Sequence, residues 1–183
     1  MKEINMEKNK LIALFPGQNY SVDMPLLYYA KFKYDIRGYD ELKICYGDYY
    51  SEEKSIEESI TLAKKNVLQQ VYDVDFSKYN DIVFVSKSIG TVIAGWLADE
   101  LGINVRHIFL TPLGRTLPYI KEHNVMAVIA GTEDKMLDSN ILSEYCKKEG
   151  VYLKQFKGVG HRLEAFGDLN INLDILKQIV ELY

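Results

Sequence analysis

Short apolar runs alternate along this chain with longer stretches that have the spacing of amphipathic helices. Six of these runs have the length and composition of strands, at residues 11–15, 41–46, 81–86, 105–111, 125–130 and 151–156. Strands that are buried on both faces and joined by crossover helices form a parallel sheet covered on both sides. The alternation therefore predicts an α/β fold, a three-layer α/β/α sandwich around a mainly parallel sheet of about six strands.

The segments between the strands carry helix signals. Ser55 and Glu58 form a capping box, in which the serine oxygen accepts a free N–H and the glutamate reaches back. Apolar residues then recur at helical spacing, and residues 169–183 show the same spacing. Right-handed crossovers place the C-terminal ends of all parallel strands at one edge, where open α/β sheets bind ligands. The residues that follow each strand are therefore the candidates for function.

Composition and charge narrow the class of protein. The 183 residues, 48% hydrophobic and 26% charged, suit one domain spanning residues 1–183. A net charge of −4 gives no reason to expect nucleic acid or an anionic membrane as a partner, and no apolar run is long enough to cross a bilayer. Cys45 and Cys146 indicate neither a disulfide framework nor a metal pair, and we expect no cofactor. The N-terminus lacks an apolar signal segment, so we expect a cytoplasmic protein.

The run at residues 81–86 is followed by the sequence SKSIG and then by a helical stretch rich in small residues. A nucleophile on such a sharp strand-to-helix turn is lifted clear of the sheet, and the next N–H points at a developing oxyanion. The turn needs small residues two positions before and two after the nucleophile, and here these are Ser86 and Gly90. Ser88 is thus the candidate nucleophile; the alternative is a serine that only caps the helix.

A carboxylate and a histidine follow two later strands. Asp134 lies in the loop after residues 125–130, where a group that orients an imidazole belongs. Its neighbours compete for that role, but Asp138 is better explained as a helix N-cap and Glu133 as a solvated charge. An ordinary turn aspartate is the alternative for Asp134 itself. His161 lies beyond the last strand in the sequence GVGHRLE, from which it can reach across the strand edge as a general base.

The run at residues 11–15 is followed by PGQNYS, a glycine turn that can present a backbone N–H to an oxyanion. Four features thus follow four strands, in the order oxyanion turn, serine, aspartate and histidine. With this order the sequence resembles the α/β-hydrolase family, through PGQNYS, SKSIGT, GTEDKMLD and GVGHRLE. The resemblance covers nearly the whole chain, from Leu11 to Tyr183.

The resemblance implies a minimal α/β-hydrolase fold with a catalytic triad on a nucleophile elbow. Ser88 would be the nucleophile, His161 the general base and then acid, and Asp134 its orienting partner. The backbone N–H groups of Gln18 and Ile89 would form the oxyanion hole.

The sequence departs from the family pattern in two places. Pro16 stands where many members have the histidine of an HG pair, and Ser86 replaces the usual glycine. The N-terminal antiparallel strands of larger members are missing. Lids are usually inserted after the strand that here ends near Leu110, and only about a dozen residues separate it from the next strand. We therefore expect a lid-less, open site.

The resemblance implies a serine esterase that acts on small or medium soluble ester substrates through an acyl-serine intermediate. Tyr20, Leu113 and Arg115 are expected to line the site, with Arg115 either recognising a substrate carboxylate or lying solvated at the surface. Thioesterase, amidase or acyltransferase chemistry on the same triad stays open, as does a non-catalytic binding protein with this fold. A flavodoxin-like nucleotide binder is disfavoured, because no GxGxxG or GxxxxGK[ST] motif follows the first strand.

Overall fold

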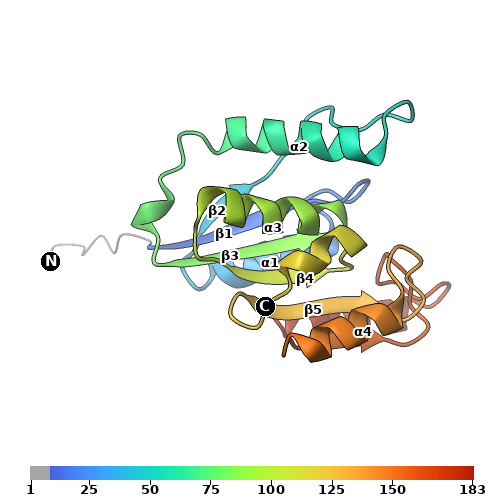
Figure 1. Cartoon of the computed structure of the whole chain (residues 1–183). Helices are drawn as coiled ribbons and strands as arrows, with labels where there is room; N and C mark the ends of the chain where they lie inside the picture. Colours follow the sequence, from blue (N-terminus) through green and yellow to red (C-terminus); the bar gives the residue numbers. More distant parts are fainter. Residues whose placement is uncertain (1–8) are drawn as a thin grey trace, which may run out of the picture.

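The structure is a computed structural model, and it describes residues 9–183 (Figure 1). Its centre is a sheet of six parallel strands in the order β2-β1-β3-β4-β5-β6, which confirms the predicted α/β architecture. The strands are β1 (Lys10–Phe15), β2 (Asp40–Lys43), β3 (Asp81–Lys87), β4 (Arg106–Leu110), β5 (Val125–Gly131) and β6 (Leu153–Phe156). The helices are α1 (Pro25–Asp35), α2 (Ile56–Gln70), α3 (Ile89–Leu101), α4 (Ser139–Lys148) and α5 (Leu169–Val180), with the 3₁₀ helices η1 (Phe76–Lys78) and η2 (Gly114–Tyr119).

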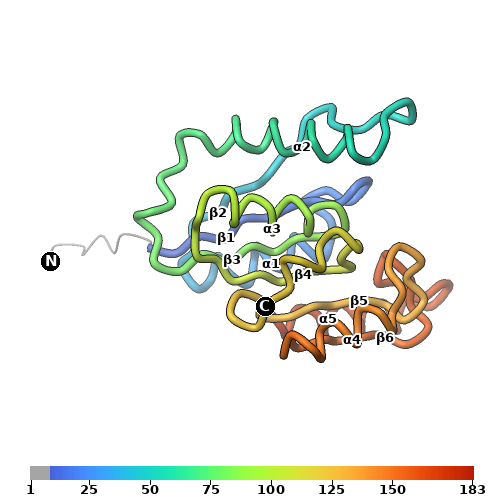
Figure 2. The backbone as a smooth tube through the Cα atoms, viewed as in Figure 1, coloured from blue at the N-terminus to red at the C-terminus, as the bar shows by residue number. Residues whose placement is uncertain are grey.

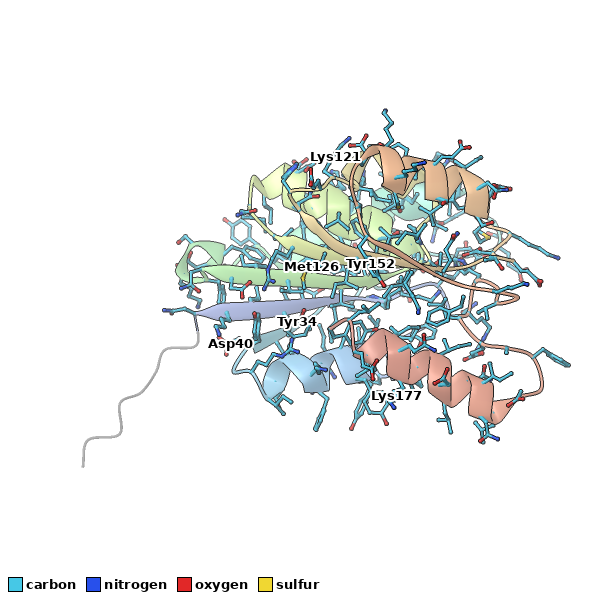
Figure 3. The ribbon with its side chains drawn as sticks, turned by 90° about the horizontal axis from the view of Figure 1, so that it is seen from below. Tyr34, Asp40, Lys121, Met126, Tyr152 and Lys177 are labelled. Atoms are coloured by element: carbon cyan, nitrogen blue, oxygen red, sulfur yellow. The ribbon has the colours of Figure 1, made fainter. Side chains whose placement is uncertain are left out.

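Helices cover both faces of the sheet, as the sequence predicts. Alternate side chains of β1 show the division, since Ile12 and Leu14 pack with α1 and α5 while Ala13 and Phe15 pack with α2 and α3. Helix α4 packs on the same face as α2 and α3, through contacts with β4 and β5. Figure 3 shows α1 and α5 side by side on one face of the sheet, with α4 on the other. Each large apolar side chain fully buried in these two layers contributes about 1.5–3 kcal/mol to folding.

The predicted helix starts are confirmed by their hydrogen bonds. The Ser55 hydroxyl accepts the backbone N–H of Glu58, whose carboxylate in turn accepts the backbone N–H of Ser55. Asp138 caps α4 by accepting the N–H groups of Asn140 and Ile141. Strand β2, predicted over residues 41–46, spans Asp40–Lys43 and pairs with β1 alone.

The fold leaves the C-terminal edge of the sheet open. In Figure 2 the loops after β1 and β5 both lie toward the right-hand end of the molecule. Between β4 and β5 the chain forms only η2, so no cap domain is inserted there, as the loop length predicts. Strands β1 and β3 pair with Phe15 beside Ser86, so the turn after β1 lies next to the turn after β3. Within residues 9–183, no helix is both long and apolar enough to cross a membrane.

Candidate active site

Ser88 has a strained backbone at the junction of β3 and α3. Its φ of 53° and ψ of −122° lie in a region that residues with a side chain rarely adopt. Although it occupies the N-cap position, its side chain makes no capping hydrogen bond to α3. Instead its Oγ lies 2.8 Å from Nε2 of His161. The side chain is thus directed at an imidazole, which the capping alternative does not explain.

The two small residues on either side of Ser88 lie in different surroundings. A Cβ atom on Gly90 would lie 2.5 Å from the carbonyl oxygen of Pro16 and 2.6 Å from that of Phe15. The start of α3 therefore approaches the turn after β1 so closely that only glycine fits. Ser86 is fully buried, and its hydroxyl lies 3.4 Å from the carbonyl oxygen of Ile108, away from the open edge.

His161 and Asp134 form the second contact of the site. The Nδ1 atom of His161 lies 2.8 Å from Oδ2 of Asp134, whose side chain is only 3% exposed. The other carboxylate oxygen accepts the backbone N–H of Met136 at 2.9 Å, which fixes the orientation of the carboxylate. A carboxylate at Nδ1 holds the proton on that nitrogen, so Nε2 is the atom that can accept the proton of the Ser88 hydroxyl.

The competing carboxylates lie elsewhere. The Asp138 side chain is engaged in the cap of α4, and Glu133 is exposed to solvent. Asp134 is the carboxylate that the structure brings to His161.

The loop that carries Asp134 and the loop that carries His161 pack closely and share a hydrogen bond. A Cβ atom on Gly131, at the end of β5, would lie only 1.9 Å from the carbonyl oxygen of Val159. Beside this contact, the Thr132 hydroxyl accepts the backbone N–H of Gly158 at 2.9 Å. These contacts were not predicted from the sequence. The feature that could have indicated them is the Gly131-Thr132 pair, which directly precedes Glu133 and Asp134.

The turn after β1 lies against Ser88. Its two backbone hydrogen bonds join Gly17 and Tyr20 at 3.0 and 3.3 Å, and a Cβ atom on Gly17 would lie 3.3 Å from Cβ of Ser88. Within residues 9–183, the N–H of Gln18 in this turn donates to no backbone carbonyl. Ile89 is the first residue of α3, so its N–H has no acceptor within the helix. These are the two predicted oxyanion donors.

A buried tyrosine from the segment after β2 holds this turn, a role that was not predicted from the sequence. The phenol of Tyr46 donates to the carbonyl oxygen of Pro16 at 3.0 Å. The backbone carbonyl of Tyr46 accepts the side-chain amide of Asn66 on α2 at 2.6 Å. Burial raises the pKa of Tyr46 well above its usual value, so the phenol keeps its proton and remains a donor.

The three predicted substrate-binding residues lie in different places. Tyr20 lines an apolar pocket of about 230 Å³ between the starts of α1 and α5, next to the loop that carries His161. Leu113 is buried in the core with α2 and α3. Arg115 forms an ion pair with Glu57 beside a separate hollow lined mainly by α2 and η2, so its charge is already balanced. Within the described residues, no group of three or more His, Cys, Asp or Glu side chains is arranged to bind a metal ion.

The parallel six-stranded sheet, together with a strained serine turn after its third strand, defines the α/β-hydrolase fold. Neither a protein-family model nor a curated protein matches the sequence. Structures of α/β-hydrolase superfamily proteins do match over nearly the whole chain.

Three of these structures are informative. A putative α/β-superfamily hydrolase from Xanthomonas campestris has a TM-score of 0.67 at 13% identity, over 94% of this chain and 96% of that one. A serine hydrolase without a lid from the same organism has a TM-score of 0.65 at 11% identity, over 96% and 81%. Est1E from Butyrivibrio proteoclasticus, with ferulic acid bound, has a TM-score of 0.61 at 14% identity, over 100% and 92%. At these identities the likeness establishes the fold.

Proposed function

We propose that this protein is a serine hydrolase that cleaves carboxylic esters of small or medium soluble substrates through an acyl-serine intermediate. The observation that carries the proposal is the pair of 2.8 Å contacts that link Ser88 to His161 and His161 to Asp134. These are the contacts of a nucleophile, its general base and the group that orients the base. The strained backbone of Ser88 supports the same role, because strain of this kind is typical of functional positions.

In the first half of the proposed reaction, Nε2 of His161 takes the proton of Ser88 as Oγ attacks the ester carbonyl carbon. The resulting oxyanion lies near the N–H groups of Ile89 and Gln18, and Asp134 stabilises the imidazolium. His161 then returns the proton to the departing alkoxide, which leaves as an alcohol. In the second half, His161 activates a water that attacks the acyl-serine, and the carboxylic acid and free Ser88 are released.

The shape of the site supports small or medium substrates. Within residues 9–183, no cap domain covers the sheet edge, so a substrate would enter directly from solvent. The pocket beside the His161 loop is lined mainly by apolar side chains, among them Tyr20, Leu26 and Leu163, and accommodates an apolar substrate group. The ferulic acid bound to Est1E, itself a small carboxylic acid, supports the same size of ligand.

We place the protein in the cytoplasm, because Cys45 and Cys146 are both free thiols.

A fluorophosphonate probe tests the nucleophile. We expect intact-protein mass spectrometry to show one adduct, which Ser88→Ala abolishes and Ser86→Ala retains. Ser86→Ala is the matched control, because it removes a hydroxyl two residues away that points into the sheet. A folded wild-type protein that forms no adduct, or an adduct located on Ser86, contradicts the proposal.

A substrate panel tests the class of reaction. It comprises p-nitrophenyl esters of graded acyl length, an acyl-thioester and an acyl-anilide. We expect the highest kcat/KM on the shorter esters. A higher kcat/KM on the thioester or the anilide assigns the protein to thioesterase or amidase chemistry instead.

A further inference from the structure

Lys87, the residue directly before Ser88, is buried although it carries an ammonium group. It is 2% exposed, and its Nζ donates to the hydroxyl of Thr111 at 2.6 Å and to the backbone carbonyl of His161 at 2.9 Å. The Nζ atom also lies 5.5 Å from the centre of the Tyr20 ring. Groups from the loops after β1, β4 and β6 thus meet at one buried cation, directly beside the candidate nucleophile.

Burying an ammonium group destabilises the fold unless its hydrogen bonds are satisfied. An apolar side chain could fill this space at a smaller cost in folding free energy. The charged groups that face Lys87 are the carboxylates of Asp134 and Glu164 and the guanidinium of Arg162. Burial lowers the pKa of Lys87 to about 8, and the charge of Asp134 opposes this shift. At neutral pH Lys87 is therefore mainly protonated, and its hydrogen bonds are charge-assisted.

The segment that carries the histidine has little regular structure of its own. Residues 157–168 form turns without helix or strand, and Gly158 and Leu163 have φ values of 71° and 61°. Such a segment needs contacts with its surroundings to hold one conformation. The Lys87 ammonium supplies one of these contacts at the backbone of the histidine itself.

We propose that Lys87 is a positioning residue, whose ammonium fixes the backbone of His161 and thereby holds the imidazole at Ser88. The inference rests on the proposed function and extends it to a residue that does not touch the reacting atoms. The expected effect is on kcat, because a catalytic group displaced by about 1 Å can cost about 100-fold in rate.

The test replaces Lys87 by methionine, which keeps the length of the side chain and removes its donors. Lys135→Met is the matched control, because this exposed lysine directly follows Asp134 in the sequence. The readouts are kcat and KM on an activated ester from pH 6 to 10, and the rate of fluorophosphonate labelling. We expect Lys87→Met to lower kcat at neutral pH by about 10-fold or more with little change in KM, and Lys135→Met to match the wild type.

The pH profile separates positioning from simple space filling. Wild-type kcat should fall as pH rises through about 8, where Lys87 loses its proton and the bond to His161 weakens. Lys87→Met should lack this alkaline fall, because methionine has no proton to lose at this position. A folded Lys87→Met protein with the wild-type kcat and the wild-type pH profile overturns the inference.

Thr111→Val keeps the test decisive if Lys87→Met does not fold. This variant retains the lysine but removes the hydroxyl that accepts one of its hydrogen bonds. With less stabilisation of the ammonium, the alkaline fall should move to lower pH. An unchanged pH profile in Thr111→Val then overturns the inference. If the wild-type protein itself is inert to fluorophosphonate, the proposed function fails, and that outcome is distinct from either variant result.

Discussion

The phenol of Tyr46 and the carbonyl oxygen of Pro16 are joined by a hydrogen bond of 3.0 Å, although the two residues are 30 positions apart. This bond ties the candidate oxyanion turn to the segment after β2. The turn begins with Pro16, at the position where many α/β-hydrolases have the histidine of an HG pair. Support for the turn comes here from the side chain of a neighbouring segment.

Removing this hydrogen bond should lower both the rate of catalysis and the stability of the fold to a modest extent. Tyr46→Phe leaves the ring in place and frees the Pro16 carbonyl, at a cost of about 0.5–1.5 kcal/mol in the free energy of unfolding. We expect kcat to fall several-fold, below the roughly 100- to 1,000-fold loss for deleting an oxyanion donor. Tyr49→Phe, which alters the ring packed edge-on against Tyr46, is the control and should change kcat little. Equal kcat values for the two variants would show that the turn does not need the bond.

The carboxylate assignment is tested by three amide substitutions. Asp134→Asn should leave the fold intact and lower kcat by about 10⁴, because asparagine no longer favours the reactive tautomer of His161. Asp138→Asn should cost little, since asparagine caps a helix about as well as aspartate. Glu133→Gln, in an exposed position, should be nearly silent. The measurement is kcat on one activated ester, with thermal melts as the folding control. Full activity in Asp134→Asn would mean that another carboxylate orients the histidine.

The close approach at Gly90 predicts a large effect for the smallest possible side chain. In Gly90→Ala the new methyl would meet the Pro16 and Phe15 carbonyl oxygens, so the turn after β1 or the start of α3 must shift. We expect a loss of about 1–3 kcal/mol in the free energy of unfolding and much slower labelling of Ser88. Gly114→Ala is the control, because a methyl group added there would have nothing within 4 Å. Urea unfolding and labelling rates measure the two effects, and a Gly90→Ala protein indistinguishable from Gly114→Ala would refute this account.

The buried His107 predicts a loss of stability in acid. Its ring stacks on Phe109, and within residues 9–183 neither ring nitrogen has a hydrogen-bond partner. Burial lowers the pKa of His107 to about 3, whereas an unfolded histidine titrates near its usual value of about 6.5. Between these values the unfolded chain binds a proton that the folded protein does not, so this group removes about 1.4 kcal/mol of stability for each pH unit as the pH falls.

Replacing this histidine by an apolar residue should remove that dependence. We expect His107→Leu to be more stable than the wild type at pH 5 and to show a smaller change in stability between pH 7.5 and pH 5. His123→Gln, at an exposed position, is the control for removing a histidine elsewhere in the chain. Urea unfolding at both pH values provides the comparison. An equal pH dependence in wild type and His107→Leu would mean that His107 is not the group responsible.

The sequence predicts the order of elements and the candidate site because both depend on local patterns. Apolar runs mark the strands, and the topology of a parallel sheet then places Ser88, Asp134 and His161 at one edge. Helix α1 is harder to delimit, because Met24 at its N-cap makes no side-chain hydrogen bond and several of its aromatic residues face solvent. Sequence spacing does not distinguish them from strand or loop aromatics.

The supports of the site are not visible in the sequence because they are contacts between distant segments. A tyrosine bonded to a turn 30 residues away and a lysine bonded to a backbone 74 residues away leave no periodic signal. Arg115 illustrates the same limit, since its pairing with Glu57 depends on how α2 lies beside η2. Only the folded arrangement reveals which polar groups are already satisfied.

The position of β6 at the edge of the sheet has a consequence for how activity is acquired. This strand pairs with β5 alone, and it leads directly into the loop that carries His161. The imidazole comes from a position 73 residues beyond Ser88 and follows the last of the six strands in chain order. A nascent or refolding chain can therefore build most of its sheet while the serine remains chemically inert. Reactivity toward a covalent probe would then appear only when β6 pairs with β5, and its time course would report the docking of this edge strand.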